Sequence, residues 1–328
     1  MIFKILSVAL LTSVLFSCSD YQKIVKGDNY EKKFLHANRM FEKETYTKAL
    51  TLYEQIYQRY PKTDKGEVAY YRIARSYYAI EDYYMAGYYF NQFTQRYPFS
   101  DNAEESLFMT AICSVKNSPK PSLDQEETDL ALNDLQLFVQ RYPESDLIDS
   151  CNRTMDRLRY KLEFKKFEAV QLYDRMENNR AAVASSQSFL QDYPRSIHIK
   201  EAAFIQFRNS YELAVKSIIS KKKERVEDAM ETYAKYSYLF DNESYEKRAI
   251  KYNENLSNEL IFVAEQYAYK DIIEAYEMSR STSEQKKVYY LEETLKRFDN
   301  FDKKYPSSEL LEKAKAIQKR AKKELVNS

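Results

Sequence analysis

The chain has 328 residues, of which 51 are basic, 50 are acidic and only three are glycine. The balanced charge argues against nucleic acid as a partner, because proteins that neutralise phosphates carry a basic excess. The scarcity of glycine argues against folds that depend on tight β-hairpins or phosphate-binding loops, and the composition predicts an all-α protein.

The first segment has the layout of a secretory signal peptide. Lys4 precedes an apolar run over residues 5–16, which is too short to span a bilayer, since a helical span needs about 20 apolar residues. The run ends in Leu15-Phe16-Ser17-Cys18, which resembles the bacterial lipobox. The resemblance implies that residues 1–17 are removed and that Cys18 carries a diacylglycerol group. The alternative is an ordinary signal peptide with an incidental cysteine.

Five of the seven prolines follow a tyrosine. These pairs are Tyr60-Pro61, Tyr97-Pro98, Tyr142-Pro143, Tyr193-Pro194 and Tyr305-Pro306. A serine or threonine stands two residues after each proline. Proline ends a helix and the hydroxyl residue can cap the next one, so the pattern predicts a joint between two helices.

Alanine recurs twelve residues before four of these prolines, at Ala49, Ala86, Ala131 and Ala182. A small side chain lets two helices approach closely, and larger residues further along fill the seam between them. These spacings resemble the tetratricopeptide repeat, in which a helix pair is closed by proline. We expect five to six helix pairs in a curved superhelical array, with a lipidated linker at residues 18–29 and repeats over residues 30–221.

Residues 222–328 are expected to form a degenerate repeat and a helical C-terminal extension. Phe240 stands where a tyrosine-proline pair would be expected. An apolar stripe that steps by three and four residues from Tyr245 to Tyr267 predicts one long helix, which reaches about Met278. A last, highly charged helix is expected from about Ser308 to Val326.

No catalytic, metal or cofactor site is predicted. Neither of the two histidines, His36 and His198, has a His, Cys or carboxylate at ligand spacing on both sides, and no nucleophile, zinc or phosphate-loop motif occurs. Glu104 and Glu105 lie in a charged stretch and are expected to be solvated. Cys113 and Cys151 could pair, but their place in helical patterns favours burial as small apolar side chains. The chain is therefore predicted not to be an enzyme.

The expected binding surface is the inner face of the array, which the first helix of each pair lines. The predicted inward positions are Phe34, Asn38, Phe41, Tyr71, Arg75, Tyr78, Phe108 and Ile112. Aromatic rings beside an amide and a guanidinium suit an extended peptide or a partner's helix, and the alternative is that the rings only seal the superhelix. In the second pair, the opposite face is expected to pack against Phe90 and Phe93. That face carries Tyr70, Ala74 and Tyr77.

Residues from about Phe34 to Leu213, together with the lipobox, resemble the BamD family, lipoproteins of the outer-membrane β-barrel assembly machinery. The resemblance rests on the order of the joints, including Arg96-Tyr97-Pro98-Phe99, and on the long turn in the third pair. It implies an anchored protein on the periplasmic face of the outer membrane. Its early repeats would bind unfolded outer-membrane proteins, and its later repeats would dock on a BamA-like barrel-forming subunit beside other assembly lipoproteins. The segment after about residue 222 exceeds the usual length of that family.

Two other classes of lipoprotein share this kind of repeat. A SusD-type glycan-binding lipoprotein is much longer and holds sugar in loops rich in tryptophan and glycine, whereas this chain has no tryptophan. A repeat adaptor in envelope maintenance or secretion would show much the same pattern. Co-purification with a barrel-forming subunit is the observation that separates these classes.

Overall fold

The structure, a computed structural model, describes residues 20–241 and 243–327. Within these residues every regular element is a helix, so the all-α fold predicted from the composition is confirmed. The predicted signal peptide and the predicted lipid-bearing Cys18 lie outside the described residues. None of the helices described is both long enough and apolar enough to span a bilayer.

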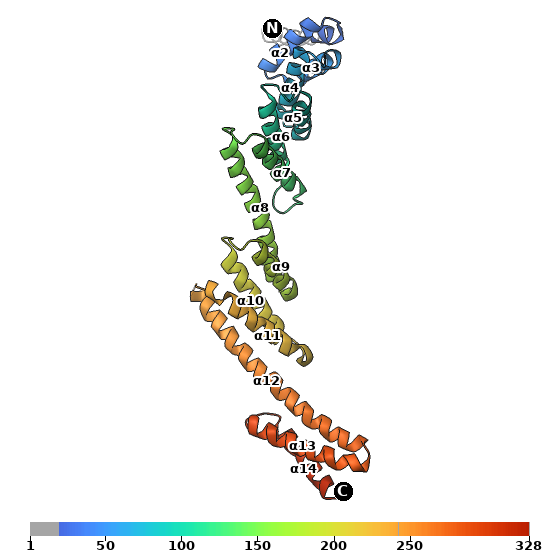
Figure 1. Ribbon diagram of the computed structural model, residues 1–328, viewed down its shortest axis with the longest axis vertical. Coiled ribbons are helices and arrows are strands. Elements are labelled where there is room, and N and C mark those ends of the chain that lie inside the picture. The colour runs from blue at the N-terminus through green and yellow to red at the C-terminus, as the bar shows by residue number, and fades with distance from the viewer. Residues whose placement is uncertain (1–19, 242, 328) are drawn as a thin grey trace, which may run out of the picture. The chain divides into compact units, whose positions relative to one another are not determined.

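The chain divides into two compact units, Met1–Phe164 and Lys165–Ser328. In the first unit a short helix at residues 20–26 is followed by helix pairs (Figure 1). The pairs are α2 (Tyr30–Glu42) with α3 (Tyr46–Arg59), α4 (Asp64–Ala79) with α5 (Tyr83–Arg96), and α6 (Ala103–Asn117) with α7 (Glu126–Arg141). From α2 to α7, each helix packs on the next along the chain, as in tetratricopeptide repeats. The 28-residue helix α8 (Ile148–Arg175) begins in this unit.

The second unit contains the rest of α8, then further helices of the repeat kind and one longer helix. Its elements are α9 (Asn179–Asp192), α10 (Ile199–Val215), α11 (Ile219–Tyr236), the 3₁₀ turn η1 (Ser237–Leu239), α12 (Glu243–Ser281), α13 (Glu284–Lys304) and α14 (Leu311–Val326). The predicted long helix is confirmed as the 39-residue α12. The last helix is confirmed too, beginning at Leu311 rather than Ser308.

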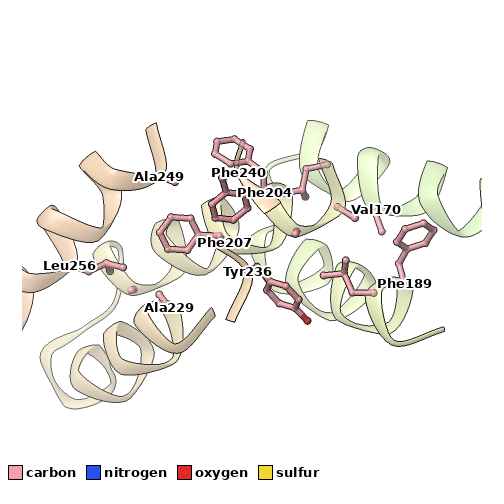
Figure 2. Close-up of a cluster of buried hydrophobic side chains, with 14 of the residues drawn as sticks. Val170, Phe189, Phe204, Phe207, Ala229, Tyr236, Phe240, Ala249 and Leu256 are labelled. Atoms are coloured by element: carbon pink, nitrogen blue, oxygen red, sulfur yellow. The ribbon is translucent and has the colours of Figure 1, made fainter. Parts of the chain in front are cut away.

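A buried cluster holds the start of the second unit together, as Figure 2 shows. Phe204 and Phe207 of α10 lie at its centre, with Phe240 at ring-centroid distances of 5.7 and 6.0 Å from them. Phe240 thus closes the degenerate repeat by filling the core, in place of a tyrosine-proline joint. Ala249 and Leu256 of α12 pack into the same cluster, which ties the extension to the repeats.

The predicted joint between helices is confirmed, and its backbone geometry recurs. The hydroxyl residue caps the next helix at Thr63, whereas at Ser100, Ser196 and Ser308 it does not. The joint tyrosines end helices α3, α5, α7, α9 and α13 with φ between −131° and −128° and ψ between 52° and 65°. Each tyrosine N–H donates to the carbonyl four residues earlier, and each tyrosine carbonyl accepts from the serine or threonine N–H three residues later. In four joints the tyrosine ring also packs on a phenylalanine four residues earlier, at 5.1–5.6 Å.

The first joint contains a glycine, Gly66, in the first turn of the helix that follows. Thr63 caps α4 by accepting a hydrogen bond from the Gly66 N–H at 3.2 Å. A Cβ atom at Gly66 would lie 1.9 Å from the carbonyl oxygen of Tyr60. Glycine is therefore required at this position by the close approach of two backbone segments.

A second kind of joint links the two helices within a pair, and the sequence did not reveal it. Glu44, Glu81 and Glu177 have left-handed φ angles of 58°, 63° and 54°. After α4, the Glu81 N–H donates to the Tyr78 carbonyl and the Asp82 N–H to the Tyr77 carbonyl, which is the Schellman pattern. Asp82 then caps α5 by accepting from the Met85 N–H at 3.1 Å.

The seam residues pack as predicted. Ala49, Ala86, Ala131 and Ala182 are fully buried. Cys113 and Cys151 are buried and unpaired, as favoured from their place in the helical pattern. Burial raises the pKa of the Cys113 thiol to about 12.

Candidate partner-binding surface

The eight predicted inward residues lie on α2, α4 and α6 of the first unit, and we call this surface the first-helix face. All eight are half-buried. On α2, Phe34 and Phe41 pack against the core of the first pair. The Tyr53 hydroxyl donates to the Asn38 side-chain oxygen at 2.7 Å. The acceptor of Asn38 is therefore used within the pair, and its amide N–H groups are the ones that could serve a partner.

Phe41 joins the first pair to the second. Its ring contacts Tyr46 and Tyr53 at centroid distances of 5.3 and 6.3 Å. The Arg72 guanidinium of α4 lies over the Phe41 ring, 4.2 Å from its centroid. A cation over an aromatic face is attracted by the ring quadrupole, so this contact links the first helices of neighbouring pairs.

Both flanks of α4 pack. The expected packing against Phe90 is confirmed for Ala74, which lies in one buried cluster with Phe90, and for Tyr77, which packs against that cluster. Tyr71 packs there as well. The ring of Tyr71 lies 5.6 Å from Phe93 and 6.2 Å from Phe90. Tyr70 contacts both Tyr57 of the preceding pair at 4.5 Å and Tyr89 of α5 at 5.3 Å. A helix inside a stack is covered on one flank by the preceding pair and on the other by its own partner, so side chains on several sides of α4 are packed.

Tyr71, Arg75 and Glu105 form a polar cluster between α4 and α6. The Tyr71 hydroxyl donates to a Glu105 carboxylate oxygen at 2.6 Å, and the Arg75 Nη1 lies 2.5 Å from the other oxygen. The side chains of Arg75 and Glu105 remain 41% and 44% exposed. Burial, and then the hydrogen bond to Glu105, raise the pKa of Tyr71 to about 12. A guanidinium has five N–H donors, so Arg75 retains donors that face solvent.

The remaining residues of the face pack within their own pairs. The Tyr78 ring lies 5.4 Å from Tyr83, and the Phe108 ring lies 5.5 Å from Phe138. Ile112 is half-buried on α6. The structure therefore brings Tyr71 and Arg75 together around one carboxylate, while the aromatic residues mainly seal the seams beneath the face.

Glu105 was missed because the sequence placed it in a solvated acidic stretch. Its position follows a spacing that recurs between first helices of successive pairs. Tyr71 donates to Glu105, which lies 34 residues later, and Glu31 pairs with Lys65 at the same spacing. In the second unit, Asp174 pairs with Arg208, again 34 residues later. Complementary polar residues 34 positions apart are therefore the signal that would have found it.

The contact in the second unit is part of a more buried network between α8 and α10. Asp174 and Arg208 are 15% and 29% exposed at their side chains. Asn209, which is almost fully buried, donates from its side chain to Asp174 at 2.7 Å. A cavity of about 370 Å³ adjoins this network, and its rim carries the charges of Arg175, Glu212 and Lys216 among others.

A family model described as "YfiO: Outer membrane lipoprotein" matches residues 28–226, which is more than half of the chain. The match begins just before α2 and ends within α11, so it includes the whole first-helix face and the network around Asp174. A search of curated proteins found no match.

Proposed function

Because the chain belongs to the YfiO family of outer membrane lipoproteins, we propose that it is a non-catalytic scaffold anchored through a lipid on Cys18 to the periplasmic face of the outer membrane. The lipobox-like sequence before Cys18 supports the anchor. The partners we propose are a BamA-like barrel-forming subunit, other assembly lipoproteins and unfolded outer-membrane proteins. The order of the repeat joints, which resembles that of the BamD family, supports this choice.

The observation that carries the proposal is the half-exposed cluster of Tyr71, Arg75 and Glu105. Glu105 holds one edge of the Arg75 guanidinium and leaves other N–H groups toward solvent. A guanidinium held in this way can form paired hydrogen bonds with a carboxylate or with backbone carbonyls of an extended peptide. Unfolded barrel strands offer both, with alternating aromatic side chains to lie on the surrounding rings.

For docking on the barrel-forming subunit we propose the charged rim beside Asp174 in the second unit. The Asp174 carboxylate pairs with Arg208 and accepts a hydrogen bond from Asn209, and all three residues line the cavity. Arg175 at the rim is exposed and is free to form charged contacts that set orientation and partner choice. The buried network would thus position the surface, and the exposed charges would recognise the partner.

Co-purification from detergent-solubilised outer membranes tests this function. The full-length lipidated chain is expected to retain a barrel-forming subunit, and Arg175→Glu is expected to retain less than half as much. Arg153→Glu, an exposed change on the same helix in the first unit, is the matched control and should retain the wild-type amount. If wild type retains no barrel-forming subunit, the assembly function is wrong and an adaptor role in another envelope process takes its place.

A further inference from the structure

The short helix at residues 20–26, which we call the anchor-proximal helix, is docked on the first helix pair. Its apolar side chains Tyr21, Ile24 and Val25 pack against the core formed by α2 and α3. The Tyr21 hydroxyl donates to the backbone carbonyl of Lys48 at 3.0 Å, and the Lys48 ammonium lies 5.6 Å from the Tyr21 ring centroid. This segment therefore has a defined place on the repeats.

A buried lysine ties the helix in place. Lys33 of α2 is only 4% exposed. Its ammonium donates to the Val25 carbonyl at 3.0 Å and to the Gln55 side chain at 2.7 Å, and it lies 4.8 Å from the Tyr30 ring. Burying an ammonium is costly unless it is hydrogen-bonded, so these contacts depend on one another. Because Val25 lies in the last turn, Lys33 places its positive charge at the negative end of the anchor-proximal helix.

The connection from this helix to α2 has little slack. The Gly27 N–H donates to the Lys23 carbonyl at 3.0 Å and so continues the helical pattern to the turn. Asn29 then caps α2 by accepting from the Lys32 N–H at 2.9 Å. Only Gly27 and Asp28 separate the last residue of the anchor-proximal helix from the cap of α2.

The short covalent link between Cys18 and the docked helix limits how far the first helix pair can lie from the membrane. Asp20, the first described residue, follows Cys18 by two residues, which span at most about 7 Å. A free tether from Cys18 to Asn29 would instead span up to about 36 Å. We infer that the anchor-proximal helix is a docked strut that holds the first helix pair against the phospholipid headgroups around the anchor. The inference rests on the proposed lipid at Cys18.

Energy transfer to the membrane surface tests the strut in the full-length lipidated chain. Leu35 is 65% exposed on α2, so Leu35→Cys accepts a donor dye, whereas Cys113 and Cys151 are buried. The acceptor is a headgroup-labelled phospholipid in vesicles of phosphatidylethanolamine and phosphatidylglycerol. In the Leu35→Cys background, the undocked variant carries alanine at positions 21, 24 and 25, and it is expected to lower the transfer efficiency at least twofold and broaden the donor lifetimes.

The matched control carries three alanines on the exposed side of the same helix, at Gln22, Lys23 and Lys26. It should keep the efficiency and the narrow lifetimes of the unchanged helix. Equal transfer from the docked and undocked proteins, with both floating with the vesicles, would overturn the strut and leave the anchor standing. If the docked protein does not float with vesicles, the anchor fails, and the strut and the proposed membrane attachment fail with it.

Discussion

The Tyr71 hydroxyl donates a hydrogen bond to Glu105, which lies 34 residues further along the chain. The contact joins α4 to α6, the first helices of successive pairs. Glu31 with Lys65 in the same unit, and Asp174 with Arg208 in the second unit, repeat the relationship at the same spacing. None of these three contacts spans the longer turn over 118–125 between α6 and α7.

Partly and fully buried tyrosines make the stability of the first unit sensitive to alkaline pH. The pKa values of Tyr70, Tyr71 and Tyr97 are each raised to about 12, with burial as the largest cause. An unfolded tyrosine titrates near pH 10, so the stabilisation is fully present below about pH 10 and is lost as pH rises toward 12. We expect the urea midpoint, followed by circular dichroism, to be flat from pH 7 to 9 and to fall steadily above pH 10.

Tyr71→Phe is the check on this assignment. The change removes one hydroxyl that must stay protonated in the folded state. Each such group lowers the free energy of unfolding by up to about 1.4 kcal/mol per pH unit in this range. The variant should be slightly less stable than wild type at pH 8, because the bond to Glu105 is lost, and should lose less stability between pH 10 and 11.5. A wild-type midpoint that stays constant to pH 11.5 would show that these tyrosines do not control alkaline unfolding.

The joints between pairs were predictable because proline imposes a strong local rule. Proline removes a backbone donor, so the helix must end, and the chain marks this point with the same tyrosine each time. The joints within pairs were not predictable in the same way. They place glutamate, an unusual residue for a left-handed backbone, at Glu44, Glu81 and Glu177. Their only signal in the sequence is the residue that follows the glutamate and serves as the N-cap of the next helix. This residue is Thr45, Asp82 or Asn178.

Glu81→Gly is expected to stabilise the protein. Glu81 is exposed and has φ 63°, a conformation that costs an L residue with a side chain about 1 kcal/mol or more and costs glycine little. The greater freedom of glycine in the unfolded chain offsets part of this gain, which leaves a net stabilisation of about 0.5 kcal/mol. Glu168→Gly is the control, since Glu168 is exposed in the middle of α8, and it should destabilise by about 1 kcal/mol. Urea unfolding in which both variants lose stability would contradict the expectation.

Gly66→Ala should destabilise the first joint by about 2 kcal/mol or more, since the added Cβ would meet the Tyr60 carbonyl oxygen at 1.9 Å. Gly87→Ala tests the same chemical change at a less crowded position. Its Cβ would lie 3.2 Å from the Cys113 Cβ, and the gain in helix propensity offsets that mild crowding. Thermal unfolding should therefore separate the two variants by several degrees, and equal midpoints would mean that the joint can relax to accept the methyl group.

The candidate surface was predicted in part. A spacing of four and three residues placed Tyr71, Arg75 and Tyr78 on one helix face, since helical periodicity is a local property. The partner of Arg75 could not be read locally, because Glu105 comes from the next pair and resembles any exposed carboxylate in the sequence. The burial of Tyr71 against Phe93 depends equally on a neighbouring helix.

The last prediction concerns how to separate binding from folding on the first-helix face. Truncating Tyr71 to alanine would remove its contacts with Phe90 and Phe93, so a loss of binding in that variant would be ambiguous. Arg75→Gln is the better probe, because the side chain is 41% exposed and an exposed ion pair contributes less than about 1 kcal/mol to stability. Its unfolding midpoint should therefore stay close to that of wild type.

Binding should respond more strongly than stability. If Arg75 forms a charged hydrogen bond with an unfolded barrel strand, its loss should weaken binding about tenfold, which corresponds to about 1.4 kcal/mol. Fluorescence anisotropy with a labelled peptide of alternating aromatic residues and a free terminal carboxylate measures this. Arg39→Gln, an exposed change on α2, should bind as wild type does. Equal affinities for wild type and Arg75→Gln would remove the cluster from substrate recognition, because the fold would be intact in both proteins and the guanidinium would be the only group that differs.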